Sequence, residues 1–206
     1  MVKNIIFDFG GVIVTLDHQE ATRRFLALGL SDAVKQLDPY TQTGIFGALE
    51  EGKISAEDFR LELSSMVGHE VTFDECKYCW LGYRKEVPKR NLDVLKRLKS
   101  EGFRLILLSN TNPYMMSWAE SNEFDGMGNS VHDYFDATYM SYLVGCMKPD
   151  RRFFSTVLQK EDILPGETLF LDDGPRNVEM ASSMGIHTFC PVNGQDWTIE
   201  IYDYLR

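Results

Sequence analysis

The sequence predicts an α/β fold in which a doubly wound parallel sheet carries an inserted helical module. Short apolar runs typical of buried parallel strands recur along the chain, and from Lys89 to the C-terminus they alternate with helical patterns. Residues 18–86, in contrast, show mainly helical periodicity. With 206 residues the chain can form one domain, or a core with a modest insertion.

The core is predicted from five strands and four helices. The apolar runs cover residues 4–8, 103–108, 136–140, 168–172 and 186–190. Their continuous apolar character indicates strands buried on both faces. Helical patterns cover residues 89–101, 113–123, 150–160 and 175–184. We therefore expect residues 1–15 and 89–206 to form the core, with ligands binding at the carboxyl ends of its strands.

Residues 16–88 are predicted to form a helical cap inserted after the first strand. No convincing strand pattern interrupts residues 18–86, and Ser55 with Asp58 resembles a capping box that opens a helix. The absence of a repeat or a long linker favours a cap packed on the core. Such a cap would serve as a lid over the site, although helices that only complete the core remain an alternative.

Charge and composition exclude several classes of protein. The chain has 21 Lys and Arg against 31 Asp and Glu, and its net charge of −10 opposes broad attraction to nucleic acid or anionic membranes. The apolar run before Asp8 is only three residues long, so we expect no signal peptide or membrane span and a cytoplasmic location. Cys76 and Cys79 have Cys-x-x-Cys spacing without a second Cys or His pair, which favours a structural role over zinc binding. Nothing indicates the oligomeric state.

Polar side chains follow four of the predicted strands at their carboxyl ends. They are Asp8, then Ser109 with Asn110, then Lys148, and finally Asp172 with Asp173. Each has an ordinary explanation when taken alone, such as a helix cap or a surface charge. Because the carboxyl ends of parallel strands meet at one edge of a sheet, we expect these groups to converge. The adjacent carboxylates repel each other unless a cation lies beside them, and hard oxygen ligands suggest Mg²⁺.

These residue types together provide the chemistry of phosphoryl transfer. Asp8 can attack phosphorus, and Mg²⁺ and Lys148 can neutralise the transferring oxygens. Ser109 and Asn110, together with Lys148, can hold the phosphate. We therefore predict a small phosphorylated metabolite as the substrate, with Asp8 and Lys148 as catalytic residues.

The same four motifs resemble those of the haloacid dehalogenase superfamily. They match in order at residues 7–12 (Phe-Asp-Phe-Gly-Gly-Val), 108–110 (Leu-Ser-Asn), 148–149 (Lys-Pro) and 172–173 (Asp-Asp), so the match spans nearly the whole chain. Within the superfamily the sequence is most similar to bacterial sugar-phosphate phosphatases, which include α-D-glucose-1-phosphate phosphatases. Residues 51–55 (Glu-Gly-Lys-Ile-Ser) and 108–112 (Leu-Ser-Asn-Thr-Asn) carry that similarity.

The resemblance implies a Rossmann-like core with a small helical cap and hydrolysis of a sugar phosphate through an aspartyl-phosphate intermediate on Asp8. It also implies Mg²⁺ bound by Asp8, the Gly10 carbonyl and Asp173, with Asp172 as a further ligand or nearby. One position departs from the usual pattern of the superfamily, because Gly10 replaces a second Asp that acts as general acid and base. The similar sugar-phosphatase branch shares this Gly. Asp17 and His18, at the start of the cap, are candidate replacements for the acid.

Two alternative functions remain open at this point. A haloacid dehalogenase also uses an Asp nucleophile and lacks the second Asp, but it needs no metal, so Asp172 and Asp173 favour a phosphatase. The other alternative is a catalytically weak pseudoenzyme that binds phosphorylated metabolites or a protein partner. The presence of Asp8, Lys148 and both later carboxylates argues against this second alternative.

Overall fold

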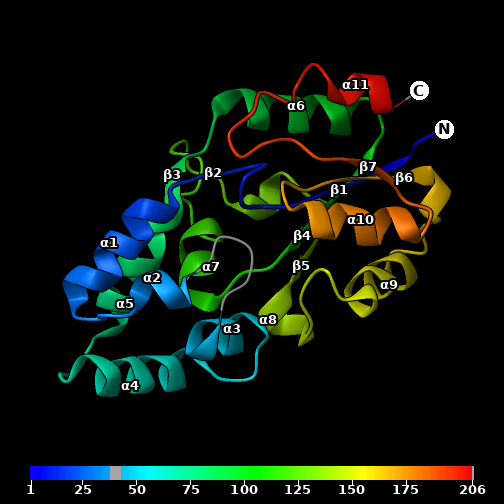
Figure 1. Cartoon of the computed structure of the whole chain (residues 1–206). Coiled ribbons are helices and arrows are strands. Elements are labelled where there is room, and N and C mark those ends of the chain that lie inside the picture. The colour runs from blue at the N-terminus through cyan, green and yellow to red at the C-terminus, as the bar shows by residue number, and fades with distance from the viewer. Residues whose placement is uncertain (38–42, 206) are drawn as a thin grey trace.

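A five-stranded parallel sheet forms the centre of the computed structural model, which describes residues 1–37 and 43–205. The strands are β1 (Asn4–Phe7), β4 (Arg104–Ser109), β5 (Ala137–Met140), β6 (Thr168–Leu171) and β7 (His187–Phe189). They lie in the order β5-β4-β1-β6-β7, with every neighbouring pair parallel (Figure 1). The predicted fold class is confirmed, and the five predicted strands differ from the observed ones by single residues at their ends.

Helices cover both faces of this sheet (Figure 1). The helices α6 (Lys89–Ser100) and α11 (Ile201–Tyr204) lie over one face, and α9 (Arg151–Lys160) and α10 (Pro175–Ser183) over the other. Successive residues of β1 point to opposite faces, so Phe7 packs in the cluster below α6 while Ile6 packs with α9 and α10. Burial on both faces explains why the strands are apolar at consecutive positions.

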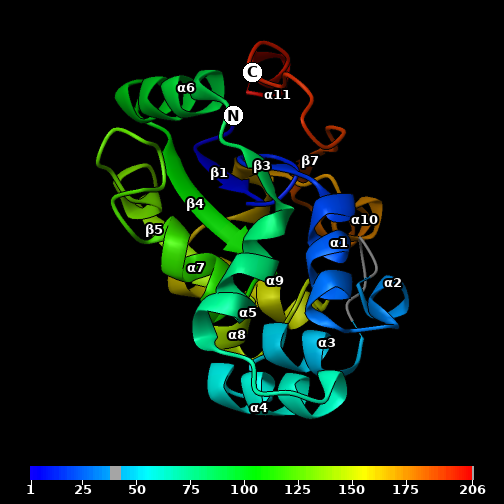
Figure 2. The ribbon, with the colours of Figure 1, turned by 90° about the vertical axis from the view of Figure 1, so that its left-hand side faces the viewer.

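A segment rich in helices connects β1 to α6. Its helices are α1 (His18–Leu28), α2 (Ala33–Gln36), α3 (Gly44–Glu50), α4 (Ala56–Val67) and α5 (Phe73–Trp80). They enclose an apolar cluster of their own around Phe25, Phe46, Phe59 and Trp80. Figure 2 shows these helices at the end of the sheet toward which the arrowhead of β4 points. This helical segment therefore lies beside the carboxyl ends of the strands.

Local sequence signals explain how helix α4 begins, and α7 shows how the helical segment meets the core. The predicted capping box is present, because Ser55 Oγ accepts a hydrogen bond from the Asp58 N–H and Asp58 Oδ2 accepts one from the Ser55 N–H, both 3.0 Å long. Helix α7 (Pro113–Ala119) packs against both regions: Tyr114 contacts the helical segment, and Trp118 belongs to the core cluster between the sheet and α6.

The structure also corrects several expectations. Residues Arg84–Glu86 form a strand, β3, which pairs antiparallel with β2 (Thr15–Leu16), although no strand was predicted in residues 18–86. All three residues of β3 are exposed and charged, so no apolar alternation marked it. Helix α7 ends at Ala119 instead of residue 123, since turns and bends replace it from residue 120. The short helices α8 (Ser141–Val144) and α11 were not predicted, because one turn carries no periodic pattern.

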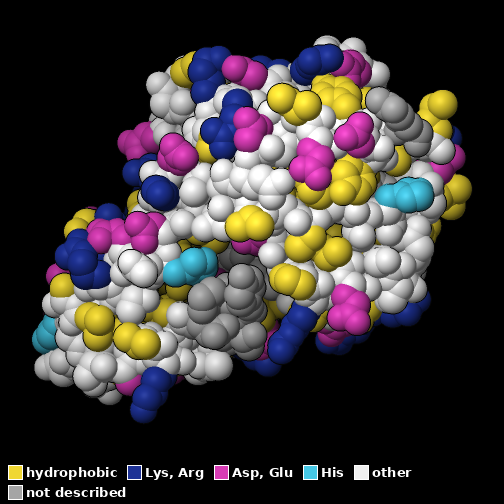
Figure 3. Space-filling model, turned by 45° about the horizontal axis from the view of Figure 1, so that its top comes forward, with side chains coloured by type: hydrophobic (Ala, Val, Ile, Leu, Met, Phe, Trp, Pro, Cys, Tyr) yellow, Lys and Arg dark blue, Asp and Glu magenta, His cyan; other side chains and the backbone are white. Residues whose placement is uncertain are grey.

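Charged side chains of both signs occur on the surface of the molecule. On the face shown in Figure 3, acidic and basic side chains lie interspersed. Within residues 1–37 and 43–205, no helix combines the length and the apolar character that crossing a bilayer requires.

Candidate active site

A cavity of about 960 Å³ lies where the carboxyl edge of the sheet meets the helical segment. The sheet edge contributes Asp8, Gly10, Ser109, Asn110, Lys148 and Asp173 to its wall. The helical segment contributes His18, Lys35, Glu50 and Trp80. The structure thus brings the residues predicted from four separate strand ends to one place, with Asp172 buried behind them.

Lys148 forms ion pairs with residues that follow two neighbouring strands, β1 and β6. Its Nζ lies 2.7 Å from Oδ1 of Asp8, which follows β1, and 2.6 Å from Oδ2 of Asp172, which follows β6. All three side chains are buried, so water screens these charges weakly. Asp173 completes a group of three carboxylates whose oxygen atoms lie within 4.8 Å of one another, and no other such group occurs in the part of the chain that the structure describes.

The environment disfavours negative charge on two of these carboxylates. Burial raises the pKa of Asp8 well above its usual value; the Lys148 ammonium opposes this shift, and Asp172 and Asp173 add to it. Burial, followed by the charge of Asp172, raises the pKa of Asp173 to about 6. For Lys148, burial alone would lower the pKa, but Asp172 and Asp8 outweigh burial and raise it. A divalent cation beside Asp8 and Asp173 would relieve this accumulation of negative charge.

Hydrogen bonds hold the charged groups in position. Asp172 Oδ1 accepts bonds from the Gly174 N–H (2.7 Å) and from Asn177 Nδ2 (2.9 Å), while its Oδ2 contacts Lys148. The amide of Asn110 donates to the Lys148 carbonyl (2.9 Å) and accepts from the Lys148 N–H (2.8 Å). The side chains of Asp172 and Asn110 are therefore occupied in orienting Lys148.

The turn after β1 allows Asp173 to approach the backbone closely. Gly11 has a φ of +76°, and a Cβ at this position would lie 2.1 Å from Asp173 Oδ2. The Asp173 carboxylate is consequently held against the 8–11 turn, beside Asp8 and Gly10. Carboxylate and carbonyl oxygens in this arrangement match the hard ligands that Mg²⁺ prefers.

Comparison with known proteins identifies the family. A model of the haloacid dehalogenase-like hydrolases matches residues 2–185. The chain belongs to this family. It is 47% identical over 201 residues to a D-ribitol-5-phosphate phosphatase of Bacteroides thetaiotaomicron, covering 98% of this chain and 97% of the relative. The resemblance seen in the motifs is therefore confirmed, and this haloacid dehalogenase-like hydrolase is a phosphoric monoester hydrolase.

Solved structures of this family share the whole fold. A haloacid dehalogenase-like hydrolase from Porphyromonas gingivalis superposes with a TM-score of 0.95 at 41% identity, covering 100% of this chain and 98% of that one. A family member from Bacteroides thetaiotaomicron, in complex with magnesium and inorganic phosphate, superposes with a TM-score of 0.88 at 32% identity. The superposition covers 97% of this chain and 99% of that one.

Other residues of this hydrolase's cavity were missed from the sequence, and one sequence candidate lies elsewhere. His18 lines the cavity, whereas Asp17 Oδ1 caps α1 by accepting a hydrogen bond from the Glu20 N–H (2.9 Å). Glu50 was not singled out, because nothing in the sequence places it beside the strand ends. Asn177, which follows Asp172 by five residues and belongs to the family resemblance in the sequence, lies in the first turn of α10 and also lines the cavity.

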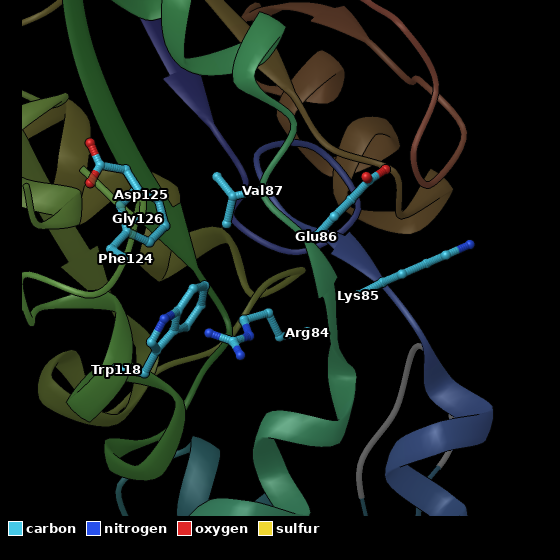
Figure 4. Close-up of a pocket in the computed structure, with 8 residues that line it drawn as sticks. All are labelled: Arg84, Lys85, Glu86, Val87, Trp118, Phe124, Asp125 and Gly126. Carbon is cyan, nitrogen blue, oxygen red and sulfur yellow. The ribbon is translucent and has the colours of Figure 1, made fainter. Parts of the chain in front are cut away.

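The hydrolase also has a second, smaller cavity of about 290 Å³, between β3 and the loop after α7. In Figure 4 the Arg84 guanidinium lies beside the Trp118 ring, while Lys85 and Glu86 extend away from it. The Arg84 Cζ atom is 4.7 Å from the ring centroid, which fits a cation–π contact. This cavity contains none of the predicted site residues.

The thiols of Cys76 and Cys79 are buried and pack inside the helical segment.

Proposed function

We propose that this hydrolase is a Mg²⁺-dependent phosphatase that uses Asp8 as its nucleophile and acts on a small phosphorylated metabolite. The observation that carries this proposal is the buried contact of Lys148 with Asp8 and Asp172, beside Asp173 at the same sheet edge. A carboxylate nucleophile, a fixed cation and a pair of oxygen ligands are the elements that phosphoryl transfer requires.

In the first step the Asp8 carboxylate attacks phosphorus, the bond from phosphorus to the ester oxygen breaks, and the leaving oxygen takes up a proton. Water then attacks phosphorus in the aspartyl phosphate, releasing inorganic phosphate and restoring Asp8. Oδ1 of Asp8 lies 2.7 Å from Lys148 Nζ and accepts a 2.7 Å hydrogen bond from the Phe9 N–H, and these contacts hold the carboxylate in place for the attack. Asp8, Asp173 and the Gly10 carbonyl would hold Mg²⁺, which neutralises charge on the transferring oxygens.

The remaining residues of the sheet edge bind the phosphate or orient Lys148. Lys148 and the Ser109 hydroxyl would hold the phosphate oxygens, since both line the cavity. We assign the side chains of Asn110 and Asp172 to orienting Lys148, because their polar atoms already bond to it or to their neighbours. We therefore propose positioning roles for Asn110 and Asp172 in place of the phosphate binding and metal binding predicted from the sequence.

We further propose a sugar or polyol phosphate as the substrate. The relative that is 47% identical acts on D-ribitol 5-phosphate. A cavity of about 960 Å³ accommodates much more than inorganic phosphate, and it lies between the strand ends and the helical segment. In this proposal residues 16–88 act as a cap that sets specificity, over a core of residues 1–15 and 89–206. His18 is the candidate to protonate the leaving oxygen in place of the Asp missing at Gly10, since it lines the cavity and Asp17 caps a helix.

Phosphate release from a panel of sugar, polyol, nucleotide and aryl phosphates tests the proposal. We expect turnover with Mg²⁺, loss of turnover in EDTA with recovery on adding Mg²⁺, and a fall of more than about 10⁴-fold in Asp8→Asn. Turnover surviving in Asp8→Asn would contradict the mechanism. Halide release from 2-haloacids in EDTA would instead support a dehalogenase.

A further inference from the structure

Glu50 is an acidic residue buried in the wall that the helical segment contributes to the cavity. It is the last residue of α3, it lines the same cavity as Asp8 and Lys148, and only 9% of its surface is exposed. Burial raises its pKa to about 7, so near neutral pH a large share of the molecules carry an uncharged carboxyl group. The phosphoryl-transfer steps proposed above do not use this residue.

Asn112 presents a polar group to the same cavity. It is fully buried, and its Oδ1 caps α7 by accepting hydrogen bonds from the Tyr114 and Met115 N–H groups, both 3.1 Å long. This cap directs Nδ2 away from the helix. The amide is near enough to Glu50 to lower the pKa of that carboxyl, yet Nδ2 has no hydrogen-bond partner of ordinary length within residues 1–37 and 43–205. A buried donor without a partner costs free energy unless a ligand accepts its hydrogen bond.

The turn that follows Glu50 is packed firmly on the core. Gly52 has a φ of +70°, and a Cβ at this position would lie 2.2 Å from the Tyr142 carbonyl oxygen in α8. This close approach fixes the end of α3 beside the segment that follows β5. Glu50 therefore has a defined position relative to the strand ends, as a residue that selects ligands requires.

We propose that Glu50 and Asn112 bind hydroxyl groups on the carbon chain of the substrate, so that the enzyme selects phosphorylated polyols and sugars over phosphate esters without hydroxyls. This assignment rests on the proposed function. A neutral carboxyl group both donates and accepts hydrogen bonds, and the amide Nδ2 donates; a hydroxyl group matches both. With the phosphoryl group at Asp8, the rest of the substrate extends into the cavity that Glu50 lines.

The apolar part of the wall suits the carbon chain of such a substrate. Leu16, Trp80 and Met115 line the cavity together with these polar groups. They can pack against the C–H groups of a polyol while Glu50 and Asn112 pair with its hydroxyls. A substrate with an ammonium group would instead require Glu50 to be ionised, and a Gln at position 50 separates the two possibilities.

The test compares D-ribitol 5-phosphate with pentyl phosphate, which has the same chain length and a similar alkoxide leaving group but no hydroxyls. We would measure kcat and KM for both esters in the wild type and in Glu50→Gln, Glu50→Leu and Asn112→Ser. The Ser retains an oxygen that can cap α7. Glu51→Gln is the matched control, because Glu51 is the next acidic residue, pairs with Lys53 and does not line the cavity.

We expect the wild type to prefer ribitol 5-phosphate in kcat/KM by at least about 100-fold, since a site that pairs with hydroxyls rejects analogues lacking them. Glu50→Leu should reduce that preference to below about 10-fold, mainly through KM for ribitol 5-phosphate. Asn112→Ser should reduce it less, and Glu50→Gln should keep most of it. Glu51→Gln should match the wild type. The inference is overturned if both esters lose activity in parallel in Glu50→Leu, or if Glu50→Gln is as impaired as Glu50→Leu.

Equilibrium binding of the two esters to Asp8→Asn, with and without Glu50→Leu, separates this inference from the proposed function. If the wild type hydrolyses neither ester but Asp8→Asn still binds ribitol 5-phosphate through Glu50, the catalytic proposal fails and the hydroxyl site stands. If aryl and alkyl phosphates are hydrolysed without any preference for hydroxyls, the phosphatase stands and the hydroxyl site is refuted. The hydroxyl site is also refuted if Asp8→Asn binds the two esters equally, both with and without Glu50→Leu.

Discussion

The sheet edge and the helical segment contribute side chains of different chemistry to the same cavity. At the sheet edge, Asp8, Lys148 and Asp172 form a buried ionic network in which nearly every polar atom has a partner. The helical wall contains apolar side chains and the carboxyl group of Glu50. Burial raises the pKa of this carboxyl group to about 7, and no cation is among the causes of the shift. In the proposed mechanism, this difference assigns the reaction to the sheet edge and the selection of the substrate to the helical wall.

Replacing Lys148 with Met should have the largest effect, because it disrupts the ionic network at the sheet edge. The change leaves Asp8 and Asp172 buried without their cation, so we expect a loss of about 3–5 kcal/mol in the free energy of unfolding. We also expect kcat to fall by about 10³-fold, because the fixed charge no longer stabilises the transferring oxygens. Urea unfolding and phosphate release measure these effects. Adding Asp172→Asn should recover part of the stability but not kcat; no recovery would contradict the ion-pair explanation.

Glu50→Gln tests the helical wall through the pH dependence of stability. The pKa of Glu50 is raised from 4.5 to about 7, so the folded protein binds more protons than the unfolded chain between these values. The contribution of Glu50 to stability is therefore greatest below about pH 4.5 and is lost as the pH rises through 7, by up to about 3 kcal/mol. Glu50→Gln should remove this loss.

The measurement is the difference in the free energy of unfolding between wild type and Glu50→Gln at pH 5 and at pH 8. Other groups that titrate, including Asp8 and Asp173, contribute equally to both proteins and cancel. Glu51→Gln is again the control. An identical difference at the two pH values would show that Glu50 does not titrate in this range.

Gly11→Ala tests the close approach of Asp173 to the turn after β1. The new Cβ would lie 2.1 Å from Asp173 Oδ2 and must displace that carboxylate. We expect the Mg²⁺ concentration for half-maximal activity to rise by about 10- to 100-fold. Gly68→Ala is a matched control in the helical segment, since Gly68 has a similar φ of +80° but no atom within 4 Å of the added Cβ. A similar change in both variants would point to backbone strain alone.

Ser55→Ala should give the smallest effect and separate stability from chemistry. Removing the capping side chain of α4 should lower the free energy of unfolding by about 1 kcal/mol. Ser55 caps α4 and does not line the cavity, so kcat for an aryl phosphate at 25 °C should stay within about twofold of wild type. A tenfold fall in kcat would mean that the helical segment takes part in phosphoryl transfer.

The sequence alone determined the core and the group of strand-end residues, because both depend on local patterns. Five apolar runs predicted five strands, and the rule that parallel strands present their carboxyl ends at one edge brought Asp8, Ser109, Lys148 and Asp173 together. Strand β3 was not predicted from the sequence. Its three exposed charged residues have no apolar alternation, and they form a strand because they pair with Thr15–Leu16.

Tertiary structure decided the residues that act through long-range contacts. Glu50 reaches the cavity because the helical segment packs at the end of the sheet, and its raised pKa comes from burial by residues distant in the chain. The sequence predicted ligand contacts for Asn110 and Asp172 but not the hydrogen bonds that join their side chains to Lys148. Such partnerships depend on distances of a few ångströms between separate strands, and spacing along one sequence does not specify them. Local motifs therefore predicted the residues of the strand ends, whereas the selectivity that we propose depends on the packing of the helical segment against the sheet.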